Sequence, residues 1–302
     1  MSTKAKWSLE EKFKDMITNY YELNSTEIEE LSEPPSALEF MRYVARNRPF
    51  ALRNGASIWP AYKKWTADYL LSIMRENQCQ YAFTPHGNAD AIVEEPDGRL
   101  VYVEPHETMQ PFDTGLAYIQ RSDAPDFDGP IAYGQTQDNN LRDEYDLLFA
   151  DCPSDIPFAR IALGEEVEAA NFWLGNSKSV TSMHRDNYEN IYAQIRGKKH
   201  FVLLPPVCAP CVNEQFVPQS KYFFDEETAT FEHKVNEPVQ MVPVPTWDPD
   251  APTERTTPLS SLAQPMRVTL NEGDMMYLPA LWYHKVSQTS GEEGFSCSVN
   301  YW

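Results

Sequence analysis

The chain has 302 residues, 42% of them hydrophobic, and its 45 acidic against 25 basic residues give a formal net charge of −20. That apolar content can bury a sizeable core, and no internal repeat or low-complexity tract favours a solenoid or a disordered chain. A strongly acidic surface repels nucleic-acid backbones and attracts basic partners, although acidity also serves solubility alone. We therefore expect no nucleic-acid partner, and a lysine- or arginine-rich peptide remains a candidate.

Five cysteines without a dense framework indicate a reducing compartment. Cys208 and Cys211 form one CxxC after two prolines. A zinc site needs two more ligands and a redox site needs a strand-to-helix turn, so neither is favoured. The polar residues Met1 to Lys6 and the lack of an apolar stretch of about 18 residues predict neither a signal peptide nor a membrane span. We expect a cytoplasmic protein, with the nucleus also open.

The N-terminal region, residues 1–48, is predicted to be helical. Ser8 with Glu11 and Ser36 with Glu39 are each spaced as a capping box, ahead of apolar residues at helical intervals. We expect both apolar stripes to pack in a core rather than bind a partner. Their members are Leu9, Phe13, Met16, Ile17, Tyr20 and Tyr21, and then Leu38, Met41 and Tyr43.

From Pro49 onward the pattern changes to short strands, with a helix from Thr66. Turn residues at Pro96–Gly98 and at Arg196–Lys198 each predict a β-hairpin. Many short strands divided by turns indicate a sandwich or barrel with flanking helices, in a single domain over 1–302. The expected strands are Phe50–Arg53, Ala91–Glu95, Arg99–Glu104, Ala117–Gln120, Ala170–Leu174, Asn190–Ile195, Lys199–Leu204, Arg267–Leu270, Met275–Leu278, Tyr283–Gln288 and Phe295–Trp302.

A proline-rich stretch interrupts this strand pattern between Pro205 and Pro265, and its strand signal is chiefly Val239–Val244. Insertions of this length are often lids or binding loops, and the alternative is a plain surface excursion. Residues 49–302 are thus predicted to form the β-barrel, with an insertion at about 205–265.

His184 and Asp186 are the first candidates for metal ligands. If they lie in one strand, side chains at i and i+2 project from the same face. One imidazole and one carboxylate are two thirds of the facial triad that holds Fe(II) in non-haem oxygenases. His284 is the best third ligand, because it follows the strand predicted at Met275–Leu278 and has aromatic neighbours. The spacing alone is a weak signal, since an isolated histidine is more often a hydrogen-bonded structural residue.

Lys199 falls on the same predicted strand face as Phe201 and Leu203. A lysine among apolar side chains is costly unless it finds an anion. A barrel lumen lined by this lysine and by Thr181, Asn190 and Tyr192 would suit a dicarboxylate. A solvated lysine at a hairpin edge is the alternative, and the residues alone do not decide between the two.

Several segments resemble JmjC-domain oxygenases: Thr181–Tyr192, Gly197–Pro206, Gly273–His284 and Val299–Trp302, with Arg48–Gly55, Trp59–Ala61, Trp65 and Asn171–Gly175 adding to the match. The resemblance covers about Asn47 to Trp302. It implies a double-stranded β-helix, the jelly roll or cupin-like fold, with Fe(II) held by His184, Asp186 and His284. It also implies 2-oxoglutarate and O2 as cosubstrates. The residues implied to contact 2-oxoglutarate or to line its pocket are Thr181 and Lys199, with Tyr118, Asn190, Tyr192 and Asn300.

The same resemblance implies a protein hydroxylase that acts on a lysine side-chain carbon, C3, of a translation-factor-related GTP-binding protein or another basic peptide, with ascorbate as the reductant in vitro. N-methyl-lysine demethylation, endopeptidase activity on histone tails and a non-catalytic cupin-type binding module are the alternatives. Relatives commonly continue into C-terminal helices that in some members form a dimer interface. This sequence stops at Trp302, directly after the last of the matching segments, so dimer formation by that route is left open.

Overall fold

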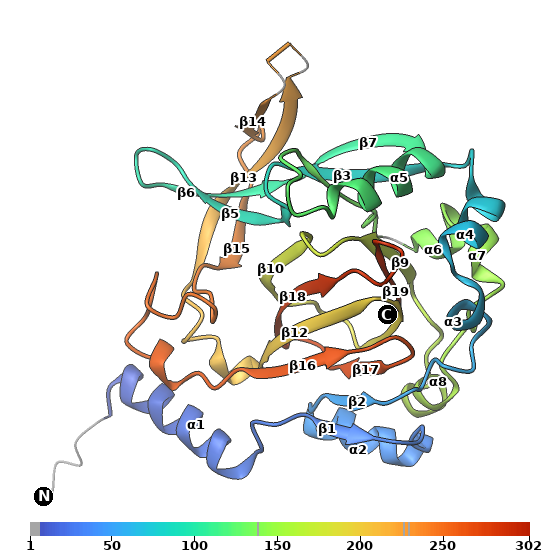
Figure 1. Cartoon of the computed structure of the whole chain (residues 1–302). Helices are drawn as coiled ribbons and strands as arrows, with labels where there is room; N and C mark the ends of the chain where they lie inside the picture. The colour runs from blue at the N-terminus through green and yellow to red at the C-terminus, as the bar shows by residue number, and fades with distance from the viewer. Residues whose placement is uncertain (1–6, 138, 226, 229) are drawn as a thin grey trace, which may run out of the picture.

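Two β-sheets wrap around a common interior in the computed structural model (Figure 1), which describes residues 7–137, 139–225, 227–228 and 230–302. The six-stranded sheet has the order β1-β2-β17-β11-β19-β9, and the five-stranded sheet has the order β16-β12-β18-β10-β4. Together they form the predicted double-stranded β-helix of a cupin-like domain. The strands are β1 (Glu29–Leu31), β2 (Phe50–Leu52), β4 (Asn88–Ala89), β9 (Ala170–Gly175), β10 (Val180–His184), β11 (Asn190–Arg196), β12 (Lys198–Leu204), β16 (Met266–Leu270), β17 (Met275–Leu278), β18 (Tyr283–Thr289) and β19 (Ser296–Tyr301).

The hairpin predicted at Arg196–Lys198 is wrong. β11 pairs with β17 and β19, whereas β12 pairs with β16 and β18, so the two strands belong to different sheets. Gly197 between them has φ +71°, and a Cβ atom there would lie 2.5 Å from the carbonyl oxygen of Thr289. The glycine therefore allows the chain to leave one sheet and enter the other directly, a choice that turn residues alone do not reveal.

The predicted N-terminal helices are confirmed as α1 (Leu9–Leu23) and α2 (Ala37–Arg46), and both capping boxes are formed. Part of the expected packing is wrong. Leu38 is 68% exposed and Met41 is 40% exposed, while Phe40 is fully buried and carries the contact with the core. Met1–Lys6, for which the sequence predicts no signal peptide, lie outside the described residues. Within the described ranges, no helix has the length and apolar character needed to cross a bilayer.

The other helices gather on one side of the sheets (Figure 1). The strand predicted at Ala117–Gln120 is wrong, because these residues belong to a longer helix. Its buried residues Phe112, Leu116 and Ile119 follow the helical interval, which a four-residue window cannot show. These helices are α3 (Pro60–Lys64), α4 (Ala67–Met74), α5 (Phe112–Ser122), α6 (Asn140–Asp143), α7 (Asp146–Phe149) and α8 (Pro157–Leu163).

Two smaller sheets extend the barrel, one in the order β7-β3-β8 and the other in the order β14-β13-β6-β5. The hairpin predicted around Pro96–Gly98 is confirmed by the pairing of β5 with β6. The insertion is more regular than its prolines indicate, because the twelve-residue β13 pairs with β6, β14 and β15. The added elements are β3 (Gln78–Thr84), β5 (Ala91–Glu94), β6 (Leu100–Glu104), β7 (His106–Pro111), β8 (Ile131–Tyr133), β13 (Glu214–Asp225), β14 (Thr230–Val235), β15 (Met241–Pro245) and the 3-10 turns η1 (Pro206–Cys208) and η2 (Ser260–Leu262).

Candidate active site

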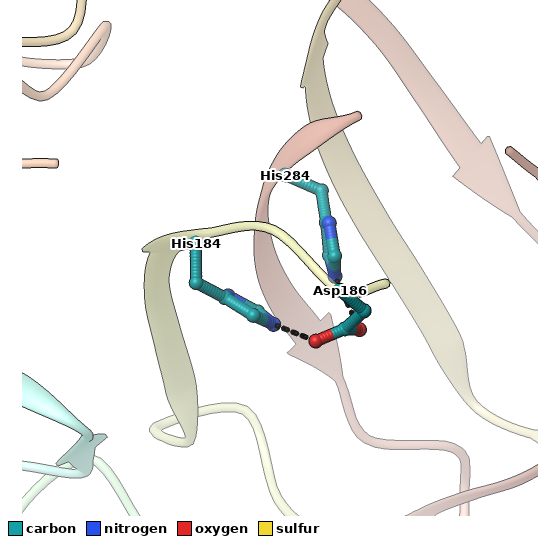
Figure 2. Close-up of side chains that lie close together, drawn as sticks. All are labelled: His184, Asp186 and His284. Atoms are coloured by element: carbon teal, nitrogen blue, oxygen red, sulfur yellow. Dashed lines mark ion pairs between the residues drawn. The ribbon is translucent and has the colours of Figure 1, made fainter. Parts of the chain in front are cut away.

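The three predicted metal ligands converge, with their side chains directed toward one another (Figure 2). His184 at the end of β10 stands opposite His284 in β18, because the two strands pair in that register. Asp186 lies just beyond β10 rather than in a strand, and its backbone carbonyl accepts a hydrogen bond from the Leu281 amide at 2.7 Å. The convergence therefore comes from strand pairing and a fixed turn, not from strand alternation alone.

Both histidines present Nε2 to the carboxylate. Nδ1 of His184 lies 2.7 Å from the Ser182 carbonyl and Nδ1 of His284 lies 3.0 Å from the Trp282 carbonyl, so each ring donates its Nδ1 proton. The free Nε2 atoms lie 4.0 and 3.5 Å from the oxygens of Asp186. Burial and then the neighbouring His184 lower the pKa of His284 to about 4, which keeps its ring neutral. Two imidazoles with Nε2 directed at one carboxylate, all within 4.8 Å of one another, fit the donor set of a non-haem Fe(II) site.

Lys199 in β12 is a buried lysine that forms no ion pair with an acidic side chain among the described residues. Its side chain is 1% exposed, and Nζ donates to the Tyr133 hydroxyl at 2.9 Å and to the Gln288 side-chain oxygen. Burial lowers the pKa of Lys199 to about 7. Nε2 of Gln288 is also buried and has no hydrogen-bond partner in the described part of the chain. A buried lysine amine whose hydrogen-bond partners in the described part of the chain are neutral groups fits an anion-binding site.

A cavity of about 660 Å³ opens in front of the three metal ligands. Thr181, Asn190, Tyr192 and Asn300 lie in its wall, where the sequence analysis expected them. Asn300 donates to Asn190 at 3.1 Å and accepts from the indole of Trp173 at 2.8 Å, so these polar groups hold one another in place. The polar side of β11 therefore faces the interior rather than solvent.

Lys199 is not itself part of the cavity wall but contacts it through Tyr133, whereas the predicted pocket residue Tyr118 lies elsewhere. Tyr118 belongs to α5, its hydroxyl donates to the Pro130 carbonyl at 2.9 Å, and it is absent from the cavity wall. The tyrosine that contacts Lys199 is Tyr133 in the three-residue strand β8. Sequence reasoning missed it because Ile131–Tyr133 is too short to give a periodic strand signal.

The wall formed by β4 to β6 and β13 carries two carboxylates that sequence reasoning also missed. Asp90 has a left-handed backbone, with φ 56°, and accepts a hydrogen bond from the Tyr102 hydroxyl at 2.9 Å. Glu104 accepts from the Gln219 amide at 2.7 Å. Burial raises the pKa of the Asp90 carboxyl. All four side chains line the cavity, and their only signal in the sequence was the general excess of acidic residues.

Cys208 and Cys211 lie in the core beneath α1 and are buried free thiols. The Tyr21 hydroxyl lies 3.0 Å from the Cys208 sulfur and accepts the Gln264 amide at 3.0 Å. These contacts of Tyr21 hold α1 against the insertion. Among the described residues, the grouping of potential metal ligands is His184, Asp186 and His284, so the CxxC takes no part in it.

Comparison with known proteins gives the same class as the fold and the site. A family model described as a cupin-like domain matches residues 35–302. With the triad and the buried lysine, this defines a cupin-like oxygenase domain. The chain is 35% identical to Lysine-specific demethylase JMJ32 of Arabidopsis thaliana (92% of this chain, 81% of that protein). It is 36% identical to the human Bifunctional peptidase and (3S)-lysyl hydroxylase JMJD7 (90% and 82%) and 34% identical to JmjC domain-containing protein E of Dictyostelium discoideum (89% and 82%).

The chain therefore belongs to the JmjC family of 2-oxoglutarate-dependent oxygenases. Membership implies Fe(II) and 2-oxoglutarate, and the residues present fit both.

Proposed function

We propose that this protein is an Fe(II)- and 2-oxoglutarate-dependent lysyl hydroxylase, which modifies C3 of a lysine side chain in a basic peptide or a GTP-binding protein. The observation that carries the proposal is the convergence of His184, Asp186 and His284 on a cavity that adjoins the buried Lys199. When bound, Fe(II) and 2-oxoglutarate supply the activation of O2 that allows oxygen insertion into an unactivated C–H bond.

The chain's own residues have separate tasks in this reaction. Hydrogen bonds from Nδ1 to backbone carbonyls fix the tautomer of both histidines, so that Nε2 is free for the metal. Lys199 and Thr181 would bind the distal carboxylate of 2-oxoglutarate. Leu278, Phe201 and Val286 contribute apolar lining to the cavity and reduce the access of water to the reacting atoms.

A cationic substrate is favoured by charge. The net charge of −20 attracts basic chains over distance, and Asp90 and Glu104 add carboxylates inside the cavity itself. The human relative carries lysyl hydroxylase in its name at 36% identity. Together these observations support a lysine side chain as the group that enters.

A panel of lysine-containing peptides, incubated with the protein, Fe(II), 2-oxoglutarate and ascorbate, tests the proposal by mass spectrometry. We expect one added oxygen on a lysine for each succinate formed. Metal-stripped protein is the control and should form neither product. Failure of every lysine peptide to gain oxygen, despite bound Fe(II) and 2-oxoglutarate, would contradict a lysyl hydroxylase.

N-methyl-lysine demethylation is a second candidate, because a relative at 35% identity is named a lysine-specific demethylase. The same site would then act on an N-methyl carbon, and formaldehyde would be released. Methylated and unmethylated versions of each peptide separate the two candidates by mass. Hydroxylation adds one oxygen to the unmethylated lysine, whereas demethylation removes one methylene from the methylated lysine.

A serine-type peptidase is disfavoured by burial. Ser220, His233 and Glu95 contact one another in succession, with 3.1 Å from Ser220 Oγ to His233 Nδ1 and 3.1 Å from His233 Nε2 to Glu95. The arrangement is similar to a serine nucleophile with its histidine base and an orienting acid. However, Ser220 is 0% exposed, so a peptide bond cannot reach it. The three residues instead fasten β14 to β13 and to the end of β5. The intact metal-ligand set likewise disfavours a cupin-type binding module without catalysis.

A further inference from the structure

Two carboxylates in the cavity wall are held by neutral groups alone. Asp90 accepts from the Tyr102 hydroxyl and Glu104 accepts from the Gln219 amide. Neither carboxylate has a lysine, arginine or histidine nitrogen within 4.0 Å among the residues that the structure describes. A partly buried carboxylate without a cation is costly, so this wall is suited to receive a positive charge from outside.

Neighbouring acids show the contrast. Glu214 lines the same cavity but is paired with Arg185 at 3.1 Å, and Glu107 just outside it is paired with Lys221 at 2.7 Å. Their charges are already balanced. Asp90 and Glu104 are therefore distinguished from the general acidity of the chain by both position and lack of a counter-charge.

Strand pairing places the unpaired acids beside the metal ligands. β4 runs parallel to β10, with Asn88 opposite Val180 and Ala89 opposite Thr181. Asp90 follows Ala89 directly, and along β10 the chain continues to His184. Since the cavity that contains the acids also contains the whole metal-ligand set, a cation bound to Asp90 has its attached carbon chain in the space before the metal ligands.

We propose that Asp90 and Glu104, positioned by Tyr102 and Gln219, bind the side-chain ammonium of the substrate lysine and so select a primary-amine side chain over an uncharged one of the same length. This assignment rests on the proposed function. The apolar side chains Ile92 and Val244 in the same wall are suited to contact the methylenes of the entering side chain.

Binding of a small probe tests the assignment without turnover. n-Pentylammonium and 1-pentanol, a charged and a neutral mimic of the lysine side chain, are titrated calorimetrically into protein loaded with Zn(II) and 2-oxoglutarate. We expect the wild type to prefer the ammonium, and the double variant Asp90→Asn/Glu104→Gln to lose about 10- to 100-fold of that preference, as for a lost charge-assisted contact. Pentanol binding should not change.

Two controls make the result specific. Glu107→Gln removes one nearby negative charge outside the cavity and should keep the preference. The double variant should keep the wild-type affinity for 2-oxoglutarate and should unfold at a midpoint no lower than that of the wild type, since asparagine tolerates the left-handed backbone at position 90 as aspartate does.

Several outcomes would overturn the assignment: no ammonium preference in the wild type, an undiminished preference in the double variant, or an equal loss in Glu107→Gln. Kinetics with a lysine peptide and its norleucine counterpart then separate this inference from the proposed function. If the ammonium preference depends on Asp90 and Glu104 but no lysine peptide is hydroxylated, the proposed hydroxylase activity is rejected and the ammonium-binding site is retained.

Discussion

The cavity joins two regions that are built from different parts of the chain. At the metal end, His184 and His284 lie on paired barrel strands, and Asp186 follows within two residues. The outer end of the cavity is the wall beside these ligands, where Asp90 and Glu104 come from the outer strands around β5 and β6 and Gln219 comes from the insertion. The metal end thus depends on a short motif and on the pairing register of two strands, whereas the outer end depends on segments that lie over a hundred residues apart in the sequence.

The comparison indicates which end tolerates change. Residues at the metal end are fixed by backbone hydrogen bonds within the barrel, so substitutions there should abolish chemistry whatever the substrate. Residues at the outer end contact one another through single side-chain hydrogen bonds, so substitutions there should alter substrate choice and leave cosubstrate binding intact.

Asp186→Ala should have the largest effect. It removes the only carboxylate among the three metal ligands, and the loss of metal-based stabilisation should lower turnover by about 10³-fold or more. Succinate formation and Fe(II) affinity are the measurements, with Asp97→Ala in the exposed β5–β6 turn as the control. Normal hydroxylation by a metal-stripped Asp186→Ala protein would refute the assignment of the metal site.

Lys199 should give a large pH effect on stability. Its pKa is about 7 in the folded chain and roughly 10.4 when unfolded, so between these values the unfolded state holds a proton that the folded state lacks. The free energy of unfolding should therefore rise with pH across this window, by up to about 1.4 kcal/mol per pH unit. The stability gained in this way is lost again as the pH is lowered through the window to the folded pKa of about 7. Denaturant unfolding of the apoprotein from pH 7 to 10 measures the slope.

Lys199→Met supplies the comparison for that slope, because it fills similar space without a titrating group. The variant should lack the contribution of Lys199 while it retains that of every other group. Parallel pH dependences in the two proteins would show that Lys199 remains charged in the fold.

Lys199→Ala should weaken 2-oxoglutarate binding by about 2–3 kcal/mol, the size of a charge-assisted contact. The adjacent Lys198 is exposed in the same strand, so Lys198→Ala is a matched control that should bind 2-oxoglutarate normally. Calorimetric titration of the metal-loaded proteins measures both. Equal affinities in the wild type and Lys199→Ala would remove this lysine from the cosubstrate site.

The metal end was predictable from sequence because its information is local. His184 and Asp186 are two residues apart, whereas the apolar neighbours of Lys199 left a buried cation and a solvated lysine both open. Even so, the inference used strand alternation, whereas the structure brings Asp186 in from a turn. The structure brings the three named residues together, but the geometric reason for their convergence was incomplete.

The arrangement of the outer end could not be predicted from the sequence in the same way. β13 interrupts its apolar pattern with Pro218, and its parallel pairing with β6 joins Gln219 to Tyr102, residues that no local pattern connects. The hairpin predicted around Gly197 was wrong for a related reason. A turn sequence specifies a change of direction, but it does not specify which sheet the next strand joins. Pairing between distant segments decides both cases.

The smallest effect is expected at a tyrosine, and comparing it with a second tyrosine tests whether strand pairing decides which residue reaches Lys199. Tyr133 contacts Lys199 through its hydroxyl, whereas the hydroxyl of Tyr118 bonds a backbone carbonyl outside the cavity. Tyr133→Phe should weaken 2-oxoglutarate binding by about 1 kcal/mol, because it removes one hydrogen bond near a buried charge, and Tyr118→Phe should leave it unchanged. Calorimetric titration of both variants at one pH gives the comparison. A loss confined to Tyr118→Phe would instead restore the residue that the sequence favoured, and would mean that the short strand β8 does not place Tyr133 at the cosubstrate site.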